Sequence, residues 1–235
     1  IMGAHKTHPD SSDFPFSYLF GDERGATVVV PGAMLRSCGL LRDEQKWPTR
    51  DRRLKRRLPL HDRIIFNVLN PFTADSMLKA IETITGLLAH PTDDDLYLRY
   101  KGMKFTRAAL ERAKFLYTSA IYKYLSLVLP DGIIPDSDGE EAGEWLDIGG
   151  QIMPRKYLEK AITLNSLKEI EDLFDEAYSR YDELERLWIG RRFDKWWRDR
   201  QNHIQIGAKQ FDEMVVDDRQ EYLDNLSRET HMLEL

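Results

Sequence analysis

Apolar residues recur at three- and four-residue spacings along most of residues 71–235. This period places the apolar side chains on one face of an α-helix, so the region is predicted to form several amphipathic helices. Two sequence signals that mark the beginning of a helix are specific. Thr106 is the predicted N-cap of a helix over 107–129, and Ser166 and Glu169 have the spacing of a capping box.

The other helix boundaries are predicted from prolines and capping residues. Thr73 is the predicted N-cap of a helix that ends at His90, which a proline follows. Pro154 suits the first turn of a later helix, because proline has no backbone N–H to leave unpaired there. A single helix is predicted from the capping box to about Trp188, and a last one near 205–227.

The N-terminal part carries a strand signal instead. Residues 28–30 are three valines between Gly25 and Pro31, a pattern typical of a short strand. The apolar run at 14–20 is the predicted partner strand, with a turn at 21–25 between the two. The predicted fold is therefore mainly α: an irregular N-terminal segment with one short strand pair, then a multi-helix, bundle-like body.

Composition narrows the class of protein. The 235 residues carry a net charge of −6, which argues against a globally basic nucleic-acid-binding protein. The one cysteine, Cys38, excludes a disulfide framework and fits a reducing compartment, so a cytoplasmic location is expected. No apolar run approaches the roughly 20 residues that a membrane span needs. Because residue 1 is not methionine, the chain is expected to be part of a longer protein.

The charge is strongly segregated along the chain. Residues 42–63, here called the Arg-rich segment, carry +5, which leaves −11 for the remainder. Guanidinium groups bind phosphate and carboxylate bidentately, and an indole ring can stack on a base or a sugar face. The candidate anion contacts are Lys46, Arg50, Arg52 and Arg53, with Trp47 as a stacking or packing anchor and Asp51 to orient the arginines.

Two other interpretations of the Arg-rich segment remain open. It is a solvated charge run that pairs with acidic residues of the same chain, or it docks a partner. The connection predicted over 130–152 supplies seven acidic residues and no Lys or Arg, so it is a natural intramolecular partner.

The sequence predicts no catalytic residue, cofactor or metal site. It contains no G-x-S-x-G, P-loop, G-x-G-x-x-G or H-E-x-x-H motif. Tyr117, Tyr122 and Tyr124 lie on the helix predicted over 107–129 and are candidates to line a pocket, although such a stripe more often belongs to a core.

Six short motifs carry a resemblance to a known family. They are Phe14-Pro15-Phe16-Ser17, Val30-Pro31-Gly32, Lys46-Trp47-x-x-Arg50-Asp51-x-Arg53, Asn70-Pro71-Phe72-Thr73, Glu144-Trp145-Leu146-Asp147-x-Gly149-Gly150-Gln151 and Phe211-Asp212-Glu213-Met214-x-x-x-Asp218. Together they resemble the C-terminal helical region of an uncharacterised bacterial family. In that family an N-terminal left-handed β-helix, like that of hexapeptide acyltransferases and sugar-nucleotide pyrophosphorylases, precedes the helical region.

The resemblance implies an accessory helical domain of a β-helix transferase-like protein. Residues 1–45 would link to the β-helix, residues 46–70 would form an Arg-rich connector, and residues 71–235 would be the helical domain. The connector would help to bind a phosphorylated sugar or a nucleotide sugar. Acyl- or nucleotidyl-transfer chemistry would belong to the β-helix, which commonly forms trimers.

The alternative is a non-catalytic structural or assembly module. Its basic segment would pair with its own acidic loop or with a partner subunit. Binding to RNA or DNA is the third interpretation, and the overall charge of −6 disfavours it most.

Overall fold

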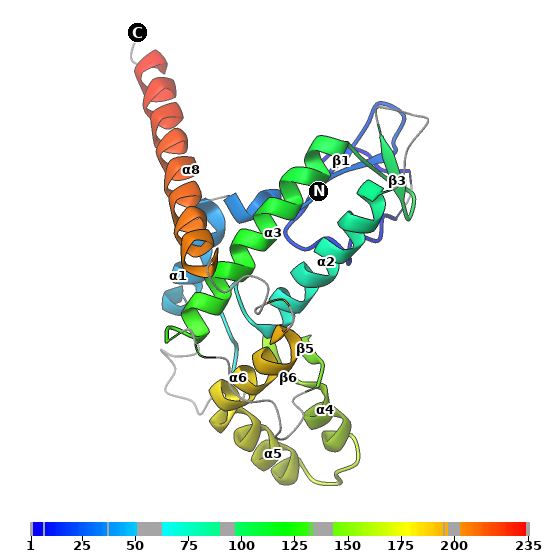
Figure 1. Ribbon diagram of the computed structural model, residues 1–235, viewed down its shortest axis with the longest axis vertical. Coiled ribbons are helices and arrows are strands. Elements are labelled where there is room, and N and C mark those ends of the chain that lie inside the picture. Colours follow the sequence, from blue (N-terminus) through cyan, green and yellow to red (C-terminus); the bar gives the residue numbers. More distant parts are fainter. Residues whose placement is uncertain are drawn as a thin grey trace.

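The computed structural model describes residues 2–6, 8–36, 38–50, 63–89, 97–131, 133, 143–194, 196 and 203–233. Within these residues the chain is mainly α-helical, as predicted (Figure 1). The helices are α1 (Cys38–Arg50), α2 (Pro71–Ala89), α3 (Arg107–Val128), α4 (Arg155–Ala161), α5 (Leu167–Ser179), α6 (Tyr181–Arg192) and α8 (Ile204–Leu233), with a short 3₁₀ helix at Ala33–Arg36.

The predicted N-terminal strand pair is confirmed. Strands β1 (Tyr18–Gly21) and β2 (Thr27–Val30) are antiparallel, with Tyr18 opposite Val30. The carboxylate of Asp22 accepts hydrogen bonds from two backbone N–H groups of the turn between them. Such side-chain-to-backbone bonds stabilise a turn locally, so the turn could be predicted from the residues at 21–25 alone.

The sheet extends beyond the predicted pair. Strand β4 (Met103–Phe105) pairs in parallel with β2, and β3 (Leu98–Tyr100) forms the far edge. A two-residue turn joins β3 and β4, and both of its residues, Lys101 and Gly102, have positive φ angles. This geometry matches the twist of a tight hairpin, but three-residue strands are too short to show an alternating pattern in sequence.

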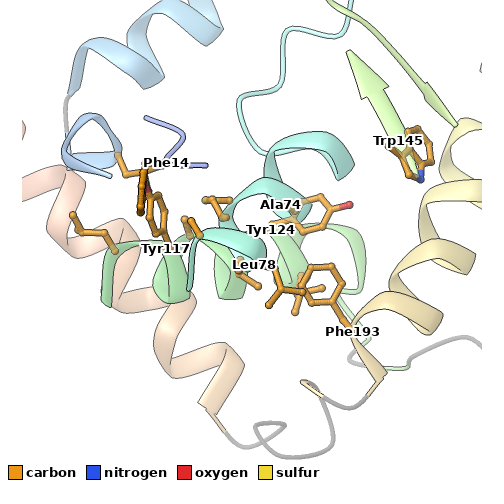
Figure 2. Packing of buried hydrophobic residues seen from close by; sticks show 14 of the residues in the cluster. Phe14, Ala74, Leu78, Tyr117, Tyr124, Trp145 and Phe193 are labelled. Atoms are coloured by element: carbon orange, nitrogen blue, oxygen red, sulfur yellow. The ribbon is translucent and has the colours of Figure 1, made fainter. Parts of the chain in front are cut away.

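Helix α3 forms the centre of the molecule, in contact with α2 on one side and α8 on the other (Figure 1). Its predicted N-cap is confirmed, since the Thr106 hydroxyl accepts from the backbone N–H of Ala109 at 3.1 Å. One wide face of α3 is buried, and Figure 2 shows Tyr117 and Phe14 at one end of this core and Trp145 at the other. The Tyr117 hydroxyl donates to the backbone carbonyl of Pro15 at 2.6 Å, so this tyrosine anchors the irregular N-terminal segment.

Two predicted helix boundaries are wrong. Helix α2 begins at Pro71 because Asn70 is its N-cap: the Asn70 Oδ1 atom accepts from the Thr73 N–H at 3.0 Å, and the Thr73 hydroxyl accepts from the Asn70 N–H at 3.1 Å. The single helix predicted up to Trp188 is in fact α5 and α6, separated at Arg180. The apolar spacing continues across this break, and a pattern of spacing does not detect one non-helical residue.

The predicted N-cap of α5, Ser166, is confirmed. The Ser166 hydroxyl accepts from the backbone N–H of Glu169 at 3.2 Å and donates to its carboxylate at 2.9 Å.

Part of the predicted acidic connection is a β-hairpin. Strands β5 (Trp145–Ile148) and β6 (Gln151–Pro154) pair in antiparallel fashion around Gly149 and Gly150, whose φ angles are 63° and 92°. Two successive residues at positive φ strongly favour glycine, so the Gly-Gly pair sets this turn. Four acidic residues of the connection, Asp136, Asp138, Glu140 and Glu141, lie outside the described residues.

The hairpin holds the segment that leads into α2. The backbone N–H of Ile65 donates to the carbonyl of Gly150 at 2.9 Å. Residues 64–70, here called the wall segment, therefore lie between the hairpin and the start of α2. Among the described residues, no helix is long and apolar enough to cross a membrane.

The close contact between α3 and α8 gives a testable prediction. A Cβ atom at Gly207 of α8 would overlap the Tyr122 ring of α3, whereas one at Gly86 of α2 would meet open space. We expect Gly207→Ala to lower the free energy of unfolding by about 1–3 kcal/mol, because the helices must separate. We expect the control, Gly86→Ala, to raise it by about 1 kcal/mol. Urea denaturation of both variants measures these changes, and equal effects would contradict the described packing.

Candidate functional site

The structure describes three of the six candidate ligand contacts. Lys46, Trp47 and Arg50 lie in the last part of α1, which continues through Pro48. Lys46 and Arg50 are four residues apart and share one side of the helix. The Trp47 side chain is 55% exposed. The other three candidates, Asp51, Arg52 and Arg53, lie outside the described residues.

The last residue of the Arg-rich segment has an intramolecular partner. The Arg63 guanidinium lies 3.0 Å from the Asp175 carboxylate of α5, and both side chains are exposed. The same guanidinium lies 5.9 Å from the centre of the Tyr178 ring. Arg63 thus pairs with an acidic helix of its own chain, at a different site from the acidic connection that follows α3.

A cleft of the described structure lies beside the wall segment. It has a volume of about 460 Å³ and is enclosed by the wall segment, the end of α3 and the start of α6. Its apolar lining residues are Ile65, Leu69, Leu127 and Val128, and its polar lining residues are Asn67, Asn70, Tyr124, Tyr181, Asp182, Glu185 and Arg186.

Hydrogen bonds fix the wall segment in place. Besides the bond from Ile65 to the hairpin, the backbone N–H of Val68 donates to the Glu44 carboxylate of α1 at 3.2 Å. At its end, Asn70 caps α2. Because its backbone is held at three points, this side of the cleft is preformed.

Glu185 is the most unusual residue of the cleft. It is only 8% exposed, and its Oε1 atom accepts a hydrogen bond from the Tyr124 hydroxyl at 2.8 Å. Burial raises the pKa of Glu185 to about 7, because a charged carboxylate is poorly solvated there, and the negative charge of Asp182 adds to the effect. The Tyr124 hydrogen bond acts in the opposite direction. Glu185 can therefore take up or release a proton near neutral pH.

Tyr124 keeps its own proton. Burial raises the pKa of Tyr124 well above its usual value, and the adjacent Glu185 charge raises it further. Tyr124 is therefore a fixed hydrogen-bond donor to Glu185. Of the three candidate tyrosines, Tyr117 belongs to the core alone, while Tyr124 is buried and also lines the cleft.

The neighbouring arginine does not neutralise Glu185. One nitrogen of the Arg186 guanidinium donates to the backbone carbonyl of Val128 at 3.3 Å, and another lies 3.5 Å from the Asp131 carboxylate. Arg186 thus holds the end of α3 against α6. Among the described residues, no basic side chain forms an ion pair with Glu185.

Aromatic residues support the α6 side of the cleft. The Tyr181 ring packs edge-on against Trp145 with 5.1 Å between ring centres, and Trp145 packs against Trp188 at 6.5 Å. Burial raises the pKa of Tyr181, so this side chain is neutral, and its packing against Trp145 fixes the ring on the α6 side of the cleft. The described residues contain no group of three or more His, Cys, Asp or Glu side chains suited to a metal ion.

Sequence reasoning missed Glu185, although a signal was present. Glu185 lies four residues after Tyr181 and three before Trp188, so it interrupts the apolar face of its helix. A charged residue in such a stripe is rarely buried without a partner. The cleft itself was hidden because its walls come from three separate parts of the chain.

Comparison with known proteins identifies two regions. Residues 1–88 match a domain of unknown function, DUF4954, and residues 132–229 match a second domain of unknown function, DUF6819. Searches of the curated proteins and of the solved structures found no match. The wall segment belongs to the first matched region and α6 to the second, while α3 lies between them. The cleft therefore lies at the junction of the two regions, a common location for ligand sites.

The raised pKa of Glu185 gives a second prediction. Since the folded chain holds this proton more tightly than the unfolded chain, the stability contributed by Glu185 is present below pH 4.5 and is lost as the pH rises through about 7. Through Glu185 the wild type should lose about 2 kcal/mol of its free energy of unfolding between pH 5 and pH 8. We expect the Glu185→Gln variant not to show this part of the loss.

Urea denaturation of the wild type and the variant at both pH values measures this difference. The control is Glu159→Gln, which changes an exposed glutamate of α4 and should leave the pH dependence intact. Parallel pH profiles for the wild type and Glu185→Gln would contradict the assignment.

Proposed function

We propose that this chain is an accessory helical domain that binds a phosphorylated sugar or a nucleotide sugar. The sugar occupies the cleft, and the phosphate faces the Arg-rich segment. The observation that carries the proposal is the preformed cleft, with a buried carboxyl group in its lining and no described basic partner for it. The side of the cleft that Asp182 and Glu185 of α6 form is here called the floor.

The lining of the cleft suits a sugar. Carboxylate and amide side chains supply the acceptors and donors that hydroxyl groups need, and Asn67, Asp182 and Glu185 place them around one space. The Tyr181 ring and the apolar residues of the wall provide surface for the carbon face of a ring. The volume of about 460 Å³ falls within the usual range for small-molecule sites.

The phosphate is expected at the rim and not at the floor. Asp182 and Glu185 make the floor acidic, and an anion there would be repelled. The basic residues are close to the wall segment along the chain. Arg63 directly precedes it, and the bond between Glu44 and Val68 attaches α1 to it, with Lys46 and Arg50 further along the same helix.

The transfer chemistry itself is assigned to a β-helix part of a larger protein. This part of the proposal is supported by the sequence resemblance alone. In this arrangement the helical chain holds or orients the ligand, and its residues take no covalent step.

One observation favours the alternative, a structural or assembly module. Arg63 already pairs with the carboxylate of Asp175, as expected of a basic segment that neutralises its own chain. Exposed ion pairs of this kind contribute only about 0–1 kcal/mol, so the pairing leaves room for a competing phosphate.

Thermal-shift titration tests the proposal. We expect millimolar glucose 6-phosphate or UDP-glucose to raise the melting temperature by a few degrees, because a ligand that binds only the folded state stabilises it. We expect Arg50→Ala to weaken binding about five- to tenfold, since it removes a charge-assisted contact. The control is Arg99→Ala, an exposed arginine of β3, which should bind as the wild type does.

Two results would overturn the proposal. One is the absence of any shift with both ligands at millimolar concentration. The other is an unchanged affinity in Arg50→Ala. If the ligands fail and sedimentation shows oligomers that dissociate as salt is raised, the assembly alternative is supported instead.

A further inference from the structure

The buried carboxyl group of Glu185 in the cleft has no positively charged partner among the described residues. Oε1 of Glu185 is bonded to Tyr124, and Oε2 has no hydrogen-bond partner among the described residues. Buried carboxylates in proteins are normally paired with a cation or hydrogen-bonded to several donors. Glu185 has one donor and an open space beside it.

Another carboxylate of the same chain shows the usual arrangement. Asp75 of α2 is 15% exposed at its side chain, and it is paired twice: with Lys79 at 2.7 Å and with Arg192 at 2.6 Å. Glu185 is buried to a similar or greater extent, yet no described cation reaches it. Of these two carboxylates, therefore, only Glu185 lacks a described cation.

The lining of the cleft supplies no described cation that pairs with Glu185. Helix α3 contributes the neutral Tyr124, and α6 contributes the neutral Tyr181 and the acidic Asp182. Arg186 is held by Val128 and Asp131. The wall segment and the α2 cap contribute only amide and apolar side chains, and β5 contributes the Trp145 indole behind Tyr181.

We propose that the ligand supplies the missing charge: it carries a protonated amine that pairs with the Glu185 carboxylate at the floor of the cleft. This inference rests on the proposed function and narrows its ligand class to a phosphorylated amino sugar. The ammonium group enters beside the Tyr181 ring, whose face attracts cations.

Binding of this kind is linked to a proton. An ammonium group favours the ionised carboxylate, so a complex formed below neutral pH must release the proton that Glu185 holds in the free chain. A neutral hydroxyl in the same place can bond to both the protonated and the ionised form of Glu185, so it favours neither form as strongly. Proton release therefore distinguishes an amine from a hydroxyl at this position.

The test compares three matched ligands by isothermal titration calorimetry at pH 6.5, in buffers that differ in ionisation enthalpy. The ligands are glucosamine 6-phosphate, glucose 6-phosphate and N-acetylglucosamine 6-phosphate. We expect the amine to bind at least tenfold more tightly than the other two and to release about three-quarters of a proton more than glucose 6-phosphate, because a carboxyl of pKa about 7 is about three-quarters protonated at pH 6.5. We expect Glu185→Gln to bind glucosamine 6-phosphate and glucose 6-phosphate equally, with the same proton release for both because only the phosphate then titrates, and Glu159→Gln to behave as the wild type.

The outcomes separate this inference from the proposed function. If none of the three ligands binds, both are overturned. If glucosamine 6-phosphate and glucose 6-phosphate bind the wild type equally, the inference fails and the proposed function stands. A preference that persists in a folded Glu185→Gln variant also overturns the inference. If that variant does not fold, the comparison of the N-acetyl ligand with glucosamine 6-phosphate on the wild type decides, because acetylation removes the charge and keeps the sugar phosphate. Equal affinities for these two ligands would then overturn the inference.

Discussion

The structure depends on the burial of α3. This helix contacts α2 and α8, and its buried face reaches both ends of the core. Its two buried tyrosines have different tasks. Tyr117 fixes the irregular N-terminal segment through the Pro15 carbonyl, and Tyr124 fixes α6 through the Glu185 carboxyl. A single amphipathic helix therefore connects the N-terminal sheet, the central helices and the cleft.

The same helix creates a costly feature of the described structure. To meet Tyr124, Glu185 must leave water, and one hydrogen bond does not replace full hydration. A glutamine at this position would keep an acceptor for Tyr124 without burying a charge. A buried ionisable group that lines a cleft is typical of functional sites, where stability is given up for binding or proton transfer.

The sequence predicted those features that local chemistry determines. The turn at Asp22, the N-cap Thr106 and the box at Ser166 each depend on residues within four positions of one another. The break at Arg180 escaped prediction because neighbouring residues keep a helical spacing on both sides. The hairpin at Gly149 was assigned to a loop because its strands lack the run of β-branched residues that marked the strand at Val28–Val30.

The candidate site was less accessible to sequence reasoning. The bond between Tyr124 and Glu185 joins residues 61 positions apart, and the wall segment is still further from α6 along the chain. Nothing in local spacing brings these parts together, since long-range packing decides which polar residue is buried. The Arg-rich segment was conspicuous by composition, but composition does not show where its charges lie relative to a cleft.

The central claim is that Glu185 is a buried carboxyl group whose charge has no basic partner in the free protein. The most direct measurement is a site-specific NMR titration of the Glu185 side-chain carboxyl carbon, assigned with Glu185→Gln. The account predicts a titration midpoint near pH 7. A midpoint near the ordinary value of 4.5 would show that the carboxyl group is solvated or already paired, and it would contradict the account.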